Sequence, residues 1–279
     1  MKKISRRSFL AAAGLSVAAL ALTACGGSSA STASSVASSA ASSEAASTSA
    51  AAGELTTVEA GKLTMATNAA FPPYEMTTDA GEFEGIDIET AQAIADKLGL
   101  ELQIDDMDFD AALLSVQQGK ADIVMAGVTV TDERKAVMDF SDSYATGIQS
   151  IIVPEGSDIA SPDDLAGKKI GTQRGTTGYI YCSDDFGDDA VVAYDNGLTA
   201  VQALNNGQVD AVVIDNAPAK EYVAANPGLA ILDTSYAEED YAIGMAKGSS
   251  LEAAVNAALE ELKADGTLQA IVDKYITAE

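Results

Sequence analysis

The sequence predicts an α/β protein that is built from two similar lobes. Two features of the 279-residue chain carry this prediction. Apolar residues follow strand-like and helix-like spacing in alternation, which is typical of a parallel sheet covered by helices. In addition, a helix-to-strand pattern in the first half recurs in the second half at a constant offset of 88 residues.

The first half predicts a β-α-β-α-β order. A strand around Leu63 and Met65 precedes a helix that stops at Gly99, because glycine favours helix ends. Alternating apolar residues at 100–104 predict a second strand, and a second helix stops at Gly119 before an apolar strand at 123–125. The helical spacing rests on Ala91, Ile94, Ala95 and Leu98 in the first helix and on Phe109, Leu113 and Val116 in the second.

The repeat joins a helix, a glycine stop and a strand that begins after an aspartate. Ala112, Leu113, Val116, Gly119, Asp122 and Val124 match Ala200, Val201, Leu204, Gly207, Asp210 and Val212. Units of this kind share composition, so chance similarity is the alternative to two similarly built lobes. The offset also aligns Gly127 with Asp215, just beyond the two strands, where open α/β sheets bind their ligands.

The N-terminal 59 residues precede the predicted fold. Residues 1–25 have a basic start, an apolar run and a small-residue site, as in a secretory signal peptide. The run is too short to favour a membrane-spanning helix. Residues 26–59 are mostly serine, alanine, threonine and glycine, which predicts a flexible tether with a reach of roughly 30 Å.

The composition excludes several classes of function. A net charge of −26 argues against nucleic-acid binding, since phosphates would be repelled. The chain has no histidine, which removes Ser-His-Asp and Cys-His catalysis and most zinc sites. Asp106, Asp108 and Asp110 have the rhythm of a calcium loop, but Ala111 and Gln117 stand where that loop needs glycine and glutamate. We therefore expect no metal, no cofactor and no catalytic residue.

Residues 126–144 place Arg134 in a turn-rich segment after an apolar strand. An arginine fork beside backbone NH groups can hold a carboxylate, although Arg134 could instead pair with a nearby acid on a solvated loop. Asp215 could hold a cation or could cap the helix that follows it. Together, Arg134 in one lobe and Asp215 in the other predict a cleft for a zwitterion such as an α-amino acid.

Several separated motifs resemble, in order, the amino-acid-binding lipoproteins of ABC importers, the polar-amino-acid group of extracellular solute-binding proteins (family 3). They are FPPYE at 71–75, GIDIE at 85–89, the segment at 126–144 and QRGTTG at 173–178. Residues 22–25, LTAC, likewise resemble a lipobox. The resemblance implies a two-lobed periplasmic-binding-protein-like fold of type II, with the ligand cleft between lobes that two hinge segments join.

The resemblance also implies roles for individual residues. Arg134, Thr129 and the backbone NH of Thr177 would bind the α-carboxylate. Asp215, the Gly127 carbonyl and the Thr129 hydroxyl would bind the α-ammonium. Phe71 and Phe109 would enclose the ligand side chain, unless they only fill the core. Asn68, Gln173 and Ile214 match positions that read the side chain; because all three are uncharged, a neutral polar, glutamine-like amino acid is favoured.

By the same resemblance, residues 60–144 and 244–279 form one lobe, residues 149–239 the other, and residues 145–148 and 240–243 the hinge. The protein would be a monomer, lipidated at Cys25 on the outer face of the cell membrane, and would deliver its amino acid to the transmembrane subunits of an ABC permease. The main alternative is a dehydratase of the same fold that acts on a prephenate-like substrate.

Overall fold

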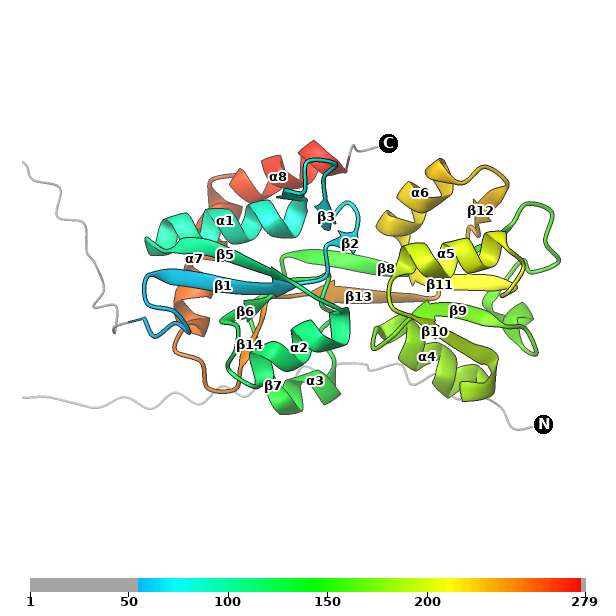
Figure 1. The fold of residues 1–279 in the computed structure, drawn as a ribbon, viewed down its shortest axis with the longest axis horizontal. Helices are drawn as coiled ribbons and strands as arrows, with labels where there is room; N and C mark the ends of the chain where they lie inside the picture. The colour runs from blue at the N-terminus through cyan, green and yellow to red at the C-terminus, as the bar shows by residue number, and fades with distance from the viewer. Residues whose placement is uncertain (1–54, 277–279) are drawn as a thin grey trace, which may run out of the picture. The chain divides into compact units, whose positions relative to one another are not determined.

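Residues 55–276, described by a computed structural model, form two helix-covered sheets (Figure 1). The elements of the first lobe are β1 (Lys62–Thr67), β2 (Ala70–Phe71), β3 (Glu75–Thr77), β4 (Phe83–Glu84), α1 (Ile86–Leu98), β5 (Glu101–Asp106), α2 (Phe109–Gln117), β6 (Ile123–Val124), α3 (Asp132–Val137), β7 (Met138–Phe140), β14 (Gly244–Ala246), α7 (Glu252–Ala264) and α8 (Thr267–Tyr275). Those of the second lobe are β8 (Ala145–Pro154), the 3₁₀ turn Pro162–Leu165, β9 (Ile170–Gln173), α4 (Thr177–Phe186), the 3₁₀ turn Asp188–Ala190, β10 (Val191–Tyr194), α5 (Gly197–Asn205), β11 (Ala211–Asp215), α6 (Asn216–Ala225), β12 (Leu229–Ile231) and β13 (Ala237–Tyr241).

Both sheets have a parallel part that antiparallel strands extend. In the first lobe the order is β5-β1-β6-β14-β7, with β1 parallel to β5 and β6 and with β14 antiparallel to its two neighbours. In the second lobe the order is β10-β9-β11-β8-β12, with β9 parallel to β10 and β11 and with β8 antiparallel to β11. A smaller antiparallel sheet, β2-β3-β4, adjoins the first lobe.

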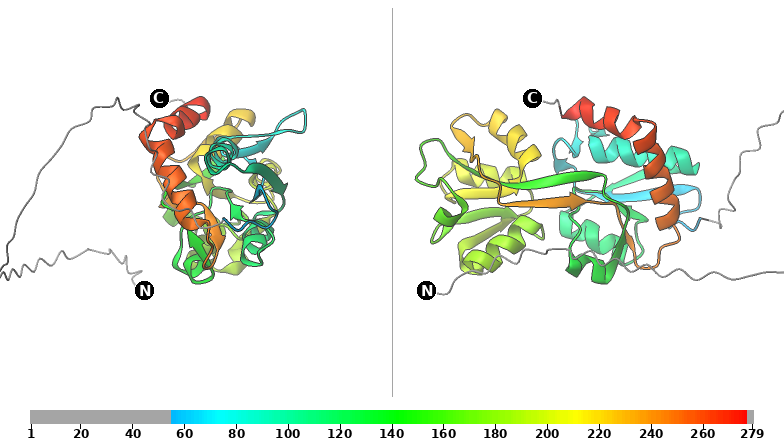
Figure 2. Two further views of the ribbon diagram at one scale, coloured as in Figure 1. Left: turned by 90° about the vertical axis from the view of Figure 1, so that its left-hand side faces the viewer. Right: turned by 180° about the vertical axis from the view of Figure 1, so that it is seen from behind.

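The predicted local signals produce the first-lobe elements. Helix α1 ends where Gly99 takes a left-handed conformation, with φ of 70°, and its NH bonds to the carbonyl groups of the last turn. Strand β1 lies between two neighbours, and its Leu63 and Met65 side chains are fully buried. Helix α1 packs against α7 and α8, which return from the C-terminal end of the described chain (Figure 2).

The repeat is confirmed at the level of elements. Helices α2 and α5 each span nine residues, and both their first and their last residues are 88 positions apart. The matching aspartates also act alike. Asp122 Oδ2 accepts the Thr64 NH at 2.8 Å, and Asp210 Oδ2 accepts the Lys169 NH at 2.7 Å. Each aspartate therefore fixes the start of the neighbouring parallel strand.

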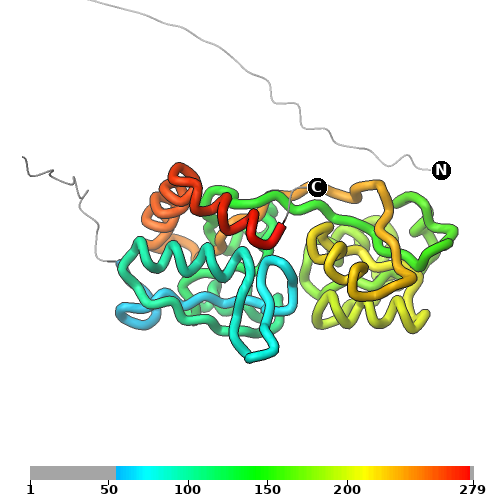
Figure 3. Tube along the Cα trace, turned by 90° about the horizontal axis from the view of Figure 1, so that it is seen from above, coloured from blue at the N-terminus to red at the C-terminus, as the bar shows by residue number. Residues whose placement is uncertain are grey.

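Two strands connect the lobes. Strand β8 leaves the first lobe at Ala145 and continues into the second sheet, and β13 runs back beside it (Figures 2 and 3). They are antiparallel, with Ala145 opposite Tyr241 and Gln149 opposite Ala237. The hinge segments expected at 145–148 and 240–243 fall on or directly after these strands.

The N-terminal predictions lie mostly outside the described residues. This applies to the signal peptide, to Cys25 and to the tether up to residue 54. At the end of the predicted tether, the Val58 NH donates to Asp122 Oδ1 at 2.7 Å. Within residues 55–276, no helix combines the length and apolar content needed to cross a bilayer.

Candidate functional site

One cavity between the lobes brings together nine of the ten residues predicted to contact the ligand; Ile214 is the exception. The space between its lining atoms is about 300 Å³, a figure that includes space open to solvent. The lining residues are Asn68, Phe71, Glu75, Phe109, Ala126, Gly127, Thr129, Arg134, Gln173, Thr176, Thr177 and Asp215. The lining thus adds Glu75, Ala126 and Thr176 to the predicted set.

Arg134 lies in the short helix α3 rather than on a solvated loop. Thr131 caps this helix by accepting the Arg134 NH, and the Arg134 side chain is buried. Its Nη1 donates to the Thr129 carbonyl at 2.7 Å and its Nη2 to the Gly175 carbonyl at 3.2 Å. Its guanidinium also lies 5.3 Å from the centre of the Phe109 ring. Both hydrogen bonds hold the guanidinium at the cavity, one from each lobe.

No described carboxylate lies within ion-pair distance of Arg134. One acid that is near Arg134 in the sequence, Asp139, binds Lys247 instead. Burial lowers the pKa of Arg134, while the acidic groups of Glu239 and Asp215 oppose that shift, and a guanidinium stays charged under these conditions. The solvated ion pair considered from sequence is therefore wrong, and the charge is available to an anion in the cavity.

The start of helix α4 supplies NH groups on the second-lobe side. Thr176 is the N-cap and accepts the Tyr179 NH through its hydroxyl. Thr177 is the first helical residue, so its NH has no partner within the helix. A helix N-terminus favours an anion through its free NH groups and its dipole. This end of the cavity therefore suits a carboxylate.

Asp215 is the last residue of β11 and lines the cavity from the second lobe. Its carboxyl group makes no capping hydrogen bond to α6, so the capping role considered from sequence is wrong. Instead it accepts Gln149 Nε2 at 2.8 Å and the Tyr241 hydroxyl. Burial raises the pKa of Asp215 to about 7. A cation in the cavity would favour the ionised carboxylate and would be held by it.

Gly127 lies where the chain approaches an aromatic ring closely. Its φ is +55°, and a Cβ at this position would lie 2.9 Å from Phe71 Cε1. Its NH donates to Asp87 Oδ2 at 3.0 Å. Glycine is therefore required both by the backbone conformation and by the contact, and Asp87 fixes the orientation of this peptide at the cavity.

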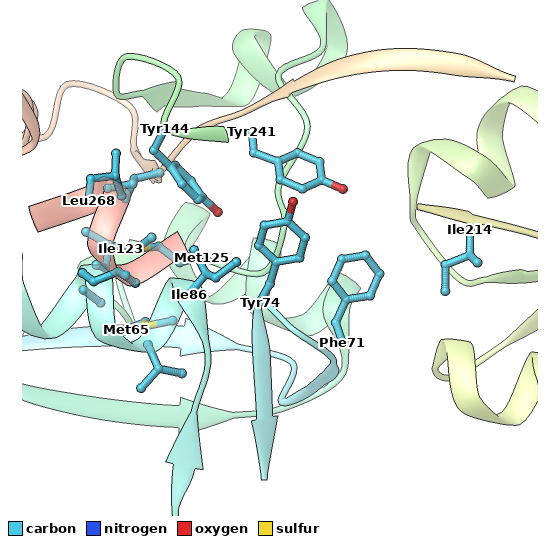
Figure 4. Packing of buried hydrophobic residues seen from close by; sticks show 14 of the residues in the cluster. Met65, Phe71, Tyr74, Ile86, Ile123, Met125, Tyr144, Ile214, Tyr241 and Leu268 are labelled. Carbon is cyan, nitrogen blue, oxygen red and sulfur yellow. The ribbon is translucent and has the colours of Figure 1, made fainter. Parts of the chain in front are cut away.

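Phe71 and Phe109 combine the two roles that were alternatives from sequence. Both rings are buried and line the cavity; Phe109 belongs to a first-lobe core cluster, and Phe71 belongs to a cluster that continues into the second lobe. Figure 4 shows Phe71 facing the second lobe, with Tyr74 behind it. The two rings of Phe71 and Tyr74 stack with centroids 6.0 Å apart. The cavity wall on the first-lobe side is thus an extension of the core.

Of the three residues expected to contact the ligand side chain, Asn68 and Gln173 line the cavity and Ile214 does not. Gln173 Nε2 donates to Asn68 Oδ1 at 2.9 Å across the lobes, and Asn68 Nδ2 donates to the Met107 carbonyl. Ile214 is not among the lining residues. It packs in the second lobe, where its Cδ1 occupies the space beside Gly197. The expectation for Ile214 is corrected because side chains alternate along β11, so Ile214 and Asp215 point to opposite faces.

Glu239 is a buried acid at the site that the sequence reasoning missed. One of its carboxyl oxygens, Oε2, accepts the Thr129 hydroxyl at 3.2 Å, the Thr177 hydroxyl at 2.9 Å and Gln149 Nε2 at 3.0 Å. These donors come from the first lobe, the second lobe and β8. In the sequence, Glu239 stands in an acidic run (Glu238, Glu239, Asp240) that reads as a solvated edge, and only the inward alternation with Tyr241 could have identified it.

Replacing Glu239 with alanine is expected to lower the free energy of unfolding by about 2–4 kcal/mol, because three buried donors lose their acceptor. Ligand affinity should fall about tenfold or more, since Thr129 and Thr177 lose their fixed orientation. Chemical denaturation and calorimetry would measure both effects. Glu238→Ala, at the exposed neighbour on β13, is the matched control. Equal behaviour of the two variants would exclude this role for Glu239.

Comparison with known proteins identifies the family of this chain. Residues 63–278 match the family of bacterial extracellular solute-binding proteins, family 3. A probable histidine-binding protein of Neisseria gonorrhoeae is 33% identical over 96% of this chain and 95% of its own length. The L-cystine-binding protein TcyJ of Escherichia coli is 34% identical over 79% and 85%.

A solved structure is also similar to this chain. An ancestral arginine-binding protein bound to glutamine superposes with a TM-score of 0.75 and 43% identity, covering 78% of this chain and 99% of its own. The fold is therefore the two-lobed, type II periplasmic-binding-protein fold. The matched proteins bind solutes and are not enzymes. The chain belongs to the bacterial extracellular solute-binding proteins of family 3.

Proposed function

We propose that this substrate-binding protein of an amino-acid ABC transporter captures a neutral polar L-amino acid by closure of its lobes and delivers it to the permease. The observation that carries the proposal is the separation of two buried charged groups around one cavity. Arg134 provides a cation without a carboxylate partner, and Asp215 provides an acid without a cationic partner among the described residues. An α-amino acid carries the two opposite charges.

The residues that would contact the ligand come from both lobes. Arg134 and Thr129 belong to the first lobe, whereas Thr177 and Asp215 belong to the second. A ligand that contacts all four groups binds the closed form more tightly than the open form, and it shifts the equilibrium by that difference. Micromolar affinity requires about 8 kcal/mol. Two charge-assisted contacts and the enclosure of a side chain by two aromatic rings are of this order.

The preference for a neutral side chain rests on the Asn68–Gln173 pair. These two amides close the cavity from opposite lobes and carry no charge. An acid or a base at either position would favour a ligand of opposite charge. The structure of an ancestral arginine-binding protein bound to glutamine, at 43% identity, supports a neutral polar ligand here. Relatives named for histidine, cystine and arginine show how far the side chain can vary within this family.

The cellular setting follows from the N-terminal sequence. We propose that Cys25 is lipidated after signal cleavage and that the residues after it tether a monomeric protein to the outer face of the membrane. The permease subunits would then take the amino acid from the tethered protein. The dehydratase alternative receives no support, because the relatives are binding proteins.

A thermal-shift screen against the twenty amino acids and cystine tests the proposal. A ligand at a hundred times its Kd stabilises a protein by about 2.7 kcal/mol. For a chain of this size that is a rise in Tm of roughly 5–10 °C. We expect the largest rise with a neutral polar amino acid, and small-angle scattering should show a more compact protein with it. No shift with any of these compounds would exclude amino-acid capture.

A further inference from the structure

Tyr222 joins the two lobes outside the ligand cavity. It lies in α6 of the second lobe, and its hydroxyl donates at 2.7 Å to the carbonyl of Ala70, which begins β2 of the first lobe. Neither residue lines the cavity, and neither belongs to the connecting strands β8 and β13. The contact therefore belongs to the arrangement of the lobes rather than to the ligand site or the hinge.

The second lobe fixes the position of the Tyr222 side chain. The ring is buried and lies beside Gly197, the first residue of α5, where a Cβ would be 3.1 Å from Tyr222 Cε2. Ile214 packs into the same space beside Gly197. Burial raises the pKa of Tyr222 above its ordinary value, so the hydroxyl stays protonated at neutral pH. The hydroxyl is thus a donor that reaches the first lobe from a fixed position.

The acceptor lies where the two lobes share an apolar contact surface. Ala70 directly precedes Phe71 in the chain, and α5 of the second lobe contacts β2 of the first (Figure 1). A single cluster of buried apolar residues includes Phe71 from the first lobe and both Ile214 and Tyr222 from the second. The Tyr222–Ala70 hydrogen bond is therefore part of a contact between the lobes that needs no ligand atom.

This hydrogen bond depends on the angle between the lobes. Because both residues lie off the connecting strands, a rotation of one lobe about β8 and β13 changes the distance between them. A hydroxyl hydrogen bond requires a donor–acceptor distance of about 3.0 Å or less. In an open form, water would hydrate the Tyr222 hydroxyl and the Ala70 carbonyl separately. The bond therefore stabilises the closed form relative to the open form.

We propose that Tyr222 sets the affinity and the residence time of every ligand by stabilising the closed form, without contacting the ligand. This inference rests on the proposed function, in which closure of the lobes captures an amino acid. When only the closed form holds the ligand fully, the apparent affinity scales with the population of that form. Loss of the Tyr222–Ala70 bond should therefore weaken the binding of all ligands by one common factor.

Tyr222→Phe removes the hydroxyl and keeps the ring. The probes are the two amino acids that give the largest shifts in the thermal screen, since they share the α-groups and differ in the side chain. We expect calorimetry to show the same loss of affinity for both, about threefold to tenfold, as for one hydrogen bond. The dissociation rates in stopped-flow measurements should rise by that factor, because the bond forms on closure. The Tm of the ligand-free protein should stay within about 2 °C, because the open form lacks the bond.

Tyr236→Phe is the matched control, because the Tyr236 hydroxyl donates at 2.6 Å to Asp185 within the second lobe. This variant should leave both affinities and both dissociation rates within about twofold of the unchanged protein. Equal behaviour of Tyr222→Phe and Tyr236→Phe would overturn the role of Tyr222. Losses that differ between the two amino acids would overturn it as well, since they would show an effect on the cavity. A lower Tm of the ligand-free Tyr222→Phe protein with unchanged affinity would show a purely structural role.

Failure of the proposed function has a different result. If the unchanged protein binds no amino acid, the proposed function fails and the role of Tyr222 in capture fails with it. If the unchanged protein binds amino acids and Tyr222→Phe binds them equally well, only the assignment of Tyr222 fails.

Discussion

Arg134→Ala is expected to reduce amino-acid affinity by at least about a hundredfold, which corresponds to ~3 kcal/mol. The loss follows because the ligand carboxylate would be buried without its cation, while the helix N-terminus at Thr177 supplies only NH groups. Isothermal titration calorimetry with the best ligand from the thermal screen measures the effect. The unfolding curve should change less than the affinity, because Arg134 binds two backbone carbonyls and no buried acid.

Arg174 provides the matched control for this variant. It is a second arginine of the same region, but it is half exposed and pairs with Asp195 at 3.7 Å. Arg174→Ala should therefore leave affinity within about twofold, since exposed ion pairs contribute little. Retention of tight binding by Arg134→Ala, or an equal loss in both variants, would remove Arg134 from the carboxylate site.

Asp215→Asn is expected to cause the second large loss, again about a hundredfold. The amide can keep both protein contacts, because its oxygen can accept from Gln149 Nε2 while its NH₂ donates to the Tyr241 hydroxyl. What it lacks is the negative charge that the α-ammonium needs. The fold should therefore survive the change while the affinity does not.

The pH dependence of ligand affinity provides a second test of Asp215. Since burial raises the pKa of Asp215 to about 7, the free protein carries a largely protonated Asp215 below that pH. An ammonium ligand must displace this proton, so affinity should fall by up to tenfold per pH unit as pH drops below about 7 and should level off above it. Calorimetry between pH 5 and 8 would show this slope in the unchanged protein, and Asp215→Asn should flatten it.

Asp210→Asn is the control for the aspartate series. Asp210 directly precedes the same strand, but its side chain binds the Lys169 NH, and Asp210 does not line the cavity. Its pH profile of binding should match that of the unchanged protein. A slope that persists in Asp215→Asn would assign the pH dependence to another group, such as Asp87.

The fold could be predicted from the sequence because the signals for its helices and strands are local and occur twice. The glycine stops, the helical spacing and the offset of 88 residues all act within or between neighbouring elements, and α2 and α5 follow them residue for residue. Nine of the ten predicted site residues also converge on one cavity, since residues beyond equivalent strand ends must meet at the cleft. Their individual roles stay predictions until binding is measured.

Glu75 and Glu239 could not be found in the same way. Charged residues are usually exposed, so an isolated acid in a sequence is read as a solvated one. The burial of Glu239 is produced by elements far apart in the chain, because its side chain meets Thr129 at a separation of 110 residues and Gln149 at 90. The misplacement of Ile214 has a simpler cause, the alternation of side chains along a strand, and that rule was available from the sequence.

The paired strands β8 and β13 limit how the molecule can move. Because backbone hydrogen bonds tie them together from Ala145 and Tyr241 to Gln149 and Ala237, one strand cannot slip along the other without breaking the ladder. Bending and twisting of the two-stranded ribbon remain as the inexpensive deformations, so we expect the lobes to rotate about it as rigid bodies. Under the proposed function, occupancy of the cleft would then set a single angle between two outer surfaces. A membrane partner that touched both surfaces would sense that angle without contacting the bound amino acid.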